Sequence, residues 1–237
     1  MNIALLTAAG SGKRTHQDIP KQFIHVDNKP IIVYTMEAFQ KHPSIDAIIV
    51  VGLKGWIDIL LVYAKQFNIT KLKWIVEGGS TNQESIKKGL IKLSRNCNKN
   101  DVIFVHDGNR PMVSQDIITD AFIKYKQYGS AVAAIRCTEA VFESEDGIES
   151  SHSIPREKLY RTQTPHVYKL DKLLWAHKEA KNRDIQNTTA TCSLMNALGE
   201  KIFFSLGSEK NIKITTIEDI EIFKALLHTN NDDWIKK

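Results

Sequence analysis

The sequence predicts an α/β fold, in which a mostly parallel β-sheet is flanked by helices. Short apolar runs bounded by turn residues are typical of buried strands, and they occur at residues 3–9, 47–51, 73–76, 102–105, 130–135 and 201–205. Segments with helical spacing lie between these runs, at residues 31–39, 56–67, 83–93, 115–128 and 170–179. This alternation favours parallel strands with helices on both faces of the sheet.

Two of the predicted helices carry clear end signals. Residues 115–128 form one apolar stripe, with Ser114 before it as a candidate cap and Gly129 after it as a terminator. Near the carboxyl end, Thr216 stands three residues before Asp219, which is the spacing of a capping box at a helix start. Both patterns predict helices that pack on the core.

Length and composition indicate the class of protein. A chain of 237 residues can build one domain whose core needs no disulfides, so we expect a single domain over residues 1–237. The three cysteines, Cys97, Cys137 and Cys192, lie far apart and lack C-x-x-C spacing, which fits a reducing cytoplasm better than a zinc or redox site. With no leader pattern and no apolar stretch of about 18 residues, we expect a cytoplasmic protein with no membrane contact.

The net charge of +5 is spread along the chain as single basic residues beside acidic ones. A nucleic-acid groove would show a basic run or interleaved aromatic residues, so we expect no nucleic-acid partner. The excess fits small anionic ligands, and it fits an ordinary solvated surface equally well.

Residues 137–157 interrupt the alternation of strands and helices. The segment carries alternating residues, an Asp-Gly turn signal at Asp146 and Gly147, and polar side chains in place of a core stripe. We interpret it as a protruding β-arm. The alternative is a surface hairpin without a partner, although an isolated hairpin is only marginally stable.

A glycine-containing loop follows the first predicted strand. It spans residues 8–14 with the sequence A-A-G-S-G-K-R, and P-K-Q follows at residues 20–22. Backbone N–H groups near glycines can approach phosphate oxygens, and Lys21 and Arg14 can neutralise their charge. The P-loop spacing is absent, and Thr15 stands where a dinucleotide-binding loop has its third glycine, which argues against a nicotinamide-dependent oxidoreductase. Taken alone, the loop could be an ordinary connection.

Three further loops carry polar residues next to strand or helix ends. Residues 77–85 can offer N–H groups and hydroxyls to a base or ribose, or can simply cap a helix with Gln83 or Ser85 bonding locally. In residues 105–111, Asp107 can orient a hydroxyl or a metal-bound water and Arg110 can bind a phosphate, unless the two merely pair with each other. His106 adjoins an apolar run and is expected to be structural. Lys213 precedes the last predicted helix.

The order of these loops resembles one family, the cytidylyltransferases that act on 2-C-methylerythritol 4-phosphate or ribitol 5-phosphate. The resemblance covers nearly the whole chain and rests on six motifs: A-A-G-S-G-K-R (8–14), I-P-K-Q-F (19–23), E-G-G (77–79), V-H-D-x-x-R-P (105–111), Q-T-P (163–165) and N-I-K-I-T-T (211–216). It implies a Rossmann-like nucleotidyltransferase fold with a β-arm that exchanges contacts across a homodimer, and Mg2+ as cofactor.

The resemblance also implies a role for individual residues. CTP would be bound by Ala8, Ala9, Gly10, Gly12, Gly79, Ser80 and Ser85. Catalysis would rest on three cations, Arg14, Lys21 and Lys213. The small polyol phosphate would be bound by Asp107, Arg110 and Thr164 of one subunit and by Thr138 and Arg156 from the partner's arm. The metal ligands stay open, with Asp107 as the candidate.

The sequence departs from the family pattern on the acceptor side. Acidic residues usual in the segment 188–193 are missing, Gly108 and Asn109 replace small apolar residues, and His166 stands where Gln usually closes Q-T-P-Q. The order Thr-Ala-Thr-Cys at 189–192 and the Trp-bearing segment 52–56 are closer to the ribitol group. We therefore expect CMP transfer to ribitol 5-phosphate or a similar pentitol phosphate, for wall or capsule polymers. The alternatives are 2-C-methylerythritol 4-phosphate, for isoprenoid synthesis, and an inactive CTP-binding module.

Overall fold

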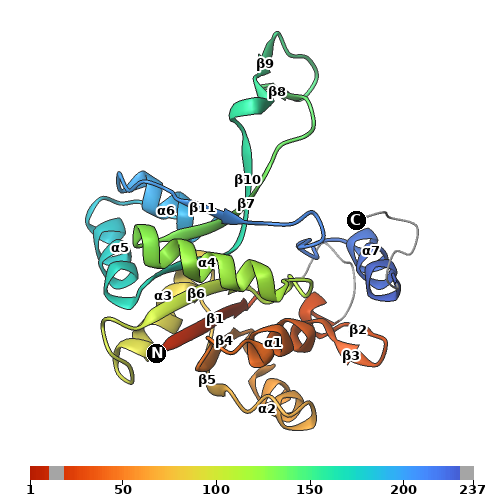
Figure 1. Ribbon diagram of the computed structural model, residues 1–237, viewed down its shortest axis with the longest axis vertical. Coiled ribbons are helices and arrows are strands. Elements are labelled where there is room, and N and C mark those ends of the chain that lie inside the picture. The colour runs from red at the N-terminus through yellow and green to blue at the C-terminus, as the bar shows by residue number, and fades with distance from the viewer. Residues whose placement is uncertain (11–18, 230–237) are drawn as a thin grey trace.

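A seven-stranded mixed sheet forms the centre of the protein (Figure 1). The computed structural model describes residues 1–10 and 19–229. The strand order is β11-β7-β10-β6-β1-β4-β5, with β1 (Asn2–Ala8), β4 (Ala47–Gly52), β5 (Leu72–Glu77), β6 (Val102–Asp107), β7 (Ala131–Arg136), β10 (Tyr160–Lys169) and β11 (Phe204–Leu206). All neighbouring pairs are parallel except those of β10, which runs antiparallel to both β6 and β7. The predicted α/β class is confirmed.

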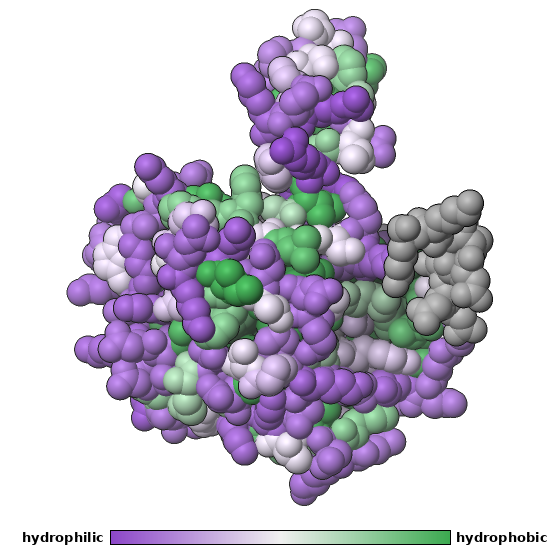
Figure 2. Space-filling view, in the orientation of Figure 1, coloured by the Kyte–Doolittle hydropathy of each residue, from purple (hydrophilic) through white to green (hydrophobic). Residues whose placement is uncertain are grey.

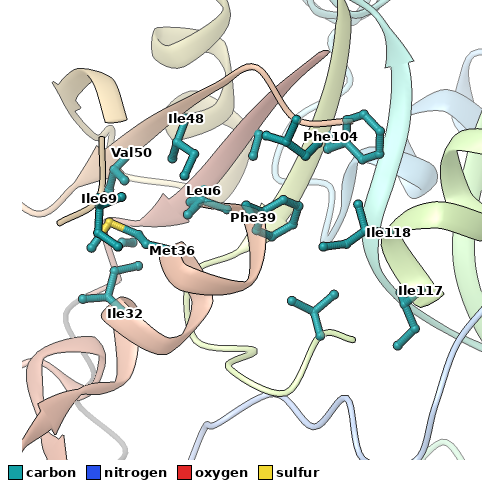
Figure 3. Packing of buried hydrophobic residues seen from close by; sticks show 14 of the residues in the cluster. Leu6, Ile32, Met36, Phe39, Ile48, Val50, Ile69, Phe104, Ile117 and Ile118 are labelled. Carbon is teal, nitrogen blue, oxygen red and sulfur yellow. The ribbon is translucent and has the colours of Figure 1, made fainter. Parts of the chain in front are cut away.

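Helices cover both faces of this sheet, as the sequence predicts. One face packs on α1 (Ile31–Lys41), α2 (Ile57–Gln66) and α4 (Gln115–Tyr128), and the other on α3 (Asn82–Ser94), α5 (Leu170–Asn182) and α6 (Thr191–Ala197). Strand β1 shows the alternation that makes this possible, because Ala4 and Leu6 point into the first core and Ile3 and Leu5 into the second. Figure 3 shows the first core, where Leu6 meets α1 side chains such as Met36.

A third, smaller core joins the carboxyl-terminal helix to the body. Helix α7 (Ile217–His228) begins at the predicted capping box of Thr216 and Asp219. Its Phe223 packs with Ile31, Ile214 and Val26, the last of which lies in the short hairpin of β2 (His25–Val26) and β3 (Lys29–Pro30). The helix thereby fixes the segment just before it, which contains Lys213.

Several elements differ from the prediction. Strand β10, helix α6 and the short hairpin of β2 and β3 were not predicted, and the strand expected at 201–205 lies at Phe204–Leu206. In β11 only Ser205 is buried, while Phe204 and Leu206 are exposed, because this edge strand directs its apolar side chains outward. Phe204 stacks there on Tyr160, with ring centroids 4.6 Å apart. The apolar run at 201–205 therefore predicted a strand here but not its bounds, because the apolar side chains of this strand are not in the core.

The predicted arm stands clear of the body in Figures 1 and 2. It contains β8 (Val141–Glu143) and β9 (His152–Ile154), which pair antiparallel. The turn between them uses Gly147 in the left-handed region, at φ 72, and Asp146 Oδ1 accepts from the N–H of Ile148 at 2.9 Å. The 3-10 helix η3 (Arg156–Lys158) follows at its base. Within the described residues, no helix is long and apolar enough to span a bilayer.

Candidate active site

Two adjoining cavities open at the carboxyl ends of β1, β5 and β6, the edge at which ligands bind in open α/β sheets. The larger has a volume of about 280 Å³ and the smaller about 140 Å³. Five residues line both of them: Thr7, Asn82, Asp107, Thr189 and Lys213. A ligand in one cavity would therefore lie next to a ligand in the other.

The structure divides the predicted site residues between the two cavities. The larger is lined by Ala8, Ala9, Gly10, Lys21, Gly79, Ser80 and Ser85. Arg110 and Thr164 line the smaller one, and Asp107 and Lys213 line both. Thr138 and Arg156 lie at the base of the arm and line neither cavity, and Arg156 Nη1 donates to the carbonyl of Thr138 at 2.9 Å. Gly12 and Arg14 lie outside the described residues.

Gln22 fixes the loop that follows β1. Its side chain is 2 % exposed, and its Nε2 donates to the carbonyls of Ala8 at 2.7 Å and Gly10 at 3.0 Å. These bonds hold the 3-10 helix η2 (Lys21–Phe23) against the end of the strand, so that Lys21 lines the larger cavity. Sequence reasoning missed this role, although a glutamine inside a cationic motif was a usable signal.

The loop after β5 is held by its own hydroxyls. Thr81 caps α3 by accepting from the N–H of Glu84, and Ser85 Oγ accepts from the N–H of Gly79 at 3.0 Å. The loop packs tightly on the first one, because a Cβ at Gly78 would lie 2.2 Å from that of Ala9. The positive end of α3 consequently faces the larger cavity, which favours an anion there.

Gln83 does not bond locally, contrary to one of the alternatives expected from the sequence. Its Oε1 accepts from the N–H of Thr188 at 3.0 Å, and its Nε2 donates to the carbonyl of Ile185 at 3.1 Å. This half-buried glutamine side chain connects α3 to the segment before α6. Gln83 therefore positions Thr189, which lines both cavities.

Asp107 is the electrostatic centre of the site. Its Oδ2 lies 3.0 Å from Arg110 Nε and 3.2 Å from Lys213 Nζ. Burial alone raises the pKa of Asp107, but the nearby Lys213 ammonium and Arg110 guanidinium outweigh this effect and hold that pKa well below its usual range. The carboxylate is ionised, and the cluster keeps a net positive charge next to both cavities.

Lys213 is positioned by its neighbours along the chain. The N–H of Ile214 donates to the carbonyl of Asn109 at 2.9 Å, and Asn109 Nδ2 donates back to the carbonyl of Ile214. On the other side of Lys213, Arg110 Nη1 donates to the carbonyl of Asn211 at 2.7 Å. Asn109, a departure from the family pattern, thus pins the loop that delivers the lysine.

A chain of hydrogen bonds under this cluster confirms that His106 is a structural residue. Thr164 Oγ1 accepts from the N–H of Asp107 at 3.0 Å and lies 3.0 Å from His106 Nδ1, while His106 Nε2 lies 3.2 Å from the carbonyl of Arg110. Burial lowers the pKa of His106 to about 3. In the neutral ring, Nε2 carries the proton and donates to the backbone carbonyl of Arg110, and Nδ1 accepts from the hydroxyl of Thr164.

Among the described residues, four buried histidines make the fold sensitive to acid. Burial lowers the pKa of His42, that of His106 to about 3, and those of His166 and His177 to about 4. Unfolded histidines bind a proton near pH 6.5, so between pH 6.5 and 4 the unfolded state binds more protons and stability falls as the pH falls, by up to roughly 1.4 kcal/mol per pH unit for each ring.

We expect the free energy of unfolding, measured by urea titration at stepped pH, to decrease from pH 7 to pH 5. His177→Leu, on α5 and outside both cavities, should make this slope shallower, because it removes one of the four contributions. An unfolding free energy that stays constant between pH 7 and pH 5 would contradict the neutral state of these rings.

The chain is similar to known proteins in both sequence and fold. The chain matches the 2-C-methyl-D-erythritol 4-phosphate cytidylyltransferase (IspD) family over residues 2–229. It is 40% identical over 229 residues to the ribitol-5-phosphate cytidylyltransferase of Lacticaseibacillus paracasei, covering 96% of this chain and 98% of that one. It is 36% identical over 228 residues to the 2-C-methyl-D-erythritol 4-phosphate cytidylyltransferase of Clostridium novyi, covering 95% and 96%. The crystal structure of 4-diphosphocytidyl-2C-methyl-D-erythritol synthase from Anaerococcus prevotii superposes with a TM-score of 0.82 at 23% identity, covering 96% of each chain.

The fold and the family match define the class of the protein as a nucleotidyltransferase. Within that class, the chain belongs to the IspD family and is a cytidylyltransferase. The family resemblance expected from the six motifs is confirmed.

Proposed function

We propose that this enzyme transfers CMP from CTP to the phosphate of ribitol 5-phosphate and releases pyrophosphate. The observation that carries the proposal is the shared wall of the two cavities, formed in part by Asp107 and Lys213. A nucleotide in the larger cavity and a polyol phosphate in the smaller would bring an acceptor phosphate oxygen close to the α-phosphorus of CTP. That oxygen attacks in line, the bond from the α-phosphorus to the bridging oxygen breaks, and pyrophosphate carries the electrons away.

The nucleotide is bound, in this proposal, by the two loops around the larger cavity. Backbone groups of Ala8, Ala9 and Gly10, with Gly12, and the loop of Gly79, Ser80 and Ser85 hold the base and ribose. Lys21 and Arg14 neutralise the triphosphate, and Lys213 stabilises charge at the junction of the two substrates. Such cations act by holding two mutually repelling anions together, and no covalent intermediate is needed.

The acceptor side consists of Asp107, Arg110 and Thr164. Arg110 is already oriented by Asp107, so its guanidinium needs little reorganisation to bind a phosphate. The similarity to the ribitol-5-phosphate enzyme of L. paracasei supports ribitol 5-phosphate. The similarity to the C. novyi enzyme makes 2-C-methyl-D-erythritol 4-phosphate the second candidate.

The choice of acceptor is tested by kcat/KM for both compounds at saturating CTP and Mg2+. We expect ribitol 5-phosphate to be preferred by more than tenfold, because a site built around hydroxyls rejects analogues that present them differently. A tenfold preference for the methylerythritol compound would overturn the choice. Absence of pyrophosphate release with any polyol phosphate would instead favour an inactive CTP-binding module.

Mg2+ is the proposed cofactor. Within residues 1–10 and 19–229, no group of three or more His, Cys, Asp or Glu side chains is arranged to hold a metal. Mg2+ in nucleotide sites is commonly held by substrate phosphates with one or two carboxylates, and Asp107 fits that requirement because it lines both cavities. The ion would supply neutralisation of the triphosphate.

We further propose that the chain folds as one domain over residues 1–237, that it acts as a homodimer through the arm, and that it works in the cytoplasm. The arm carries Phe142 and Ile148, which are 58% and 88% exposed. Burial of such side chains against a second copy would stabilise the dimer. In that assembly Thr138 and Arg156 would complete the partner's acceptor site.

A further inference from the structure

The smaller cavity contains two buried polar side chains to which the family resemblance assigns no role. His166 is 2% exposed and Thr191 is 4% exposed, and both line this cavity. Neither ring nitrogen of His166 nor Thr191 Oγ1 has a hydrogen-bond partner among the residues that the structure describes. The backbone of Gln163 is near enough to favour a proton on the His166 ring, but it lies outside hydrogen-bonding geometry.

Tyr168 Oη, Ser205 Oγ and Asn211 Oδ1 also lack a partner among the described residues, but they line neither cavity, whereas Gln163 and Thr164, which line the smaller one, are satisfied. Gln163 Nε2 donates to the carbonyl of Ser208 at 2.8 Å, and its Oε1 accepts from the N–H of the same residue at 3.1 Å. Thr164 is bonded to Asp107 and His106. A buried polar group without a partner costs stability, so an exception that lines a ligand cavity points to a ligand that supplies the bonds.

Sequence and fold explain why these side chains face the cavity. Strand β10 has a register irregularity between Thr162 and His166, after which Val167 points into one core and Tyr168 into the other. His166 lies on the same face as Tyr168, toward α3 and α6. Thr191 is the first residue of α6. Ile86 of α3 and Val105 of β6 form an apolar wall of the same cavity.

The chemistry of this cavity matches a carbon chain that carries hydroxyl groups. Burial keeps the His166 ring neutral at pH 7, because its pKa is lowered to about 4. A neutral imidazole has one donor and one acceptor, and a threonine hydroxyl has both functions. An alcohol also donates and accepts, whereas a carboxylate or second phosphate only accepts. The apolar wall suits the C–H groups of the same chain.

We propose that His166 and Thr191 are specificity-determining residues that hydrogen-bond the hydroxyl groups of the acceptor's carbon chain. This inference rests on the proposed function, with Arg110 and Lys213 at the phosphate end of the acceptor. The two residues select polyol phosphates whose hydroxyls reach β10 and α6, and they discriminate against analogues that lack those hydroxyls.

The test measures kcat/KM for ribitol 5-phosphate and for its monodeoxy analogues in Thr191→Val and His166→Phe. Each variant keeps the approximate shape of its side chain and loses its hydrogen-bonding atoms. We expect kcat/KM for ribitol 5-phosphate to fall roughly 10- to 100-fold, the cost of leaving a substrate hydroxyl unpaired. The KM for CTP should stay within about twofold. With the analogue that lacks the partner hydroxyl, variant and wild type should have the same kcat/KM.

Conservative and control variants separate specificity from folding. Thr191→Ser and His166→Gln keep hydrogen-bonding atoms and should recover part of the loss. Ser205→Ala removes another buried hydroxyl that has no partner within the described residues but lies on β11 outside both cavities, and it should leave acceptor kinetics unchanged. The inference is overturned if Thr191→Val and His166→Phe use every acceptor as wild type does. Absence of wild-type turnover with all polyol phosphates would overturn the proposed function as well.

Discussion

Lys213→Ala should lower kcat/KM roughly 100-fold while leaving the fold intact. The ammonium lies on the wall shared by the two cavities, 3.2 Å from Asp107, where the proposed mechanism has charge develop as pyrophosphate departs. Loss of one such cation costs ~3 kcal/mol of transition-state stabilisation. The side chain is 43% exposed and Arg110 still neutralises Asp107, so the thermal midpoint should change little. Initial rates of pyrophosphate release at varied acceptor concentration measure the effect.

Lys210→Ala provides a matched control for this prediction. Lys210 lies in the same segment, three residues earlier, is exposed and lines neither cavity. The Lys210→Ala substitution removes the same charge from the protein, so it reports any general effect of net charge on the binding of anionic substrates. We expect wild-type kinetics from it. Lys213→Ala with more than a third of wild-type kcat/KM would remove Lys213 from the proposed catalytic residues.

Where local signals agree with tertiary packing, the sequence predicts the fold closely. Helix α4 has the predicted bounds, because Ser114 caps it and Gly129 ends it in the left-handed region at φ 80. Helix α6 was missed because Ala190 at its N-cap offers no side-chain bond and gives no start signal. Strand β10 was missed because its polar residues from Arg161 to Thr164 do not alternate with apolar ones. Their burial is set by the cavities and the neighbouring strands, which local patterns do not report.

The candidate site could be predicted residue by residue only through the resemblance. Spacing alone left Asp107 and Arg110 open to a simple pairing, and the structure shows that they do pair, while Lys213 joins them from about a hundred residues away. Gln22 and Asn109 hold the loops that carry these side chains. The place of Gln22 in a cationic motif was a signal, but its partners, and those of Asn109, are set by tertiary packing. His166 was noted only as a departure from a motif, because burial without a partner is visible only in three dimensions.

Arg156→Ala should also lower activity roughly 100-fold, and mixing it with Lys213→Ala should restore part of the loss. Arg156 lies at the base of the arm and lines neither cavity of its own chain, so the proposed dimer has it act on the partner's acceptor. In a two-fold symmetric dimer the arms exchange. One site of a mixed dimer then combines an intact Lys213 with an intact Arg156, and the other has both defects.

Random exchange makes half of the dimers mixed, so about a quarter of wild-type activity should return. Mixing Lys213→Ala with Asp107→Asn is the matched negative control, because both residues belong to the same subunit's cavities and no mixed dimer has a complete site. Differently tagged subunits and native mass spectrometry verify exchange. If exchange is complete and the first mixture stays as inactive as the control, Arg156 does not act across the dimer, and the arm then serves assembly or another partner.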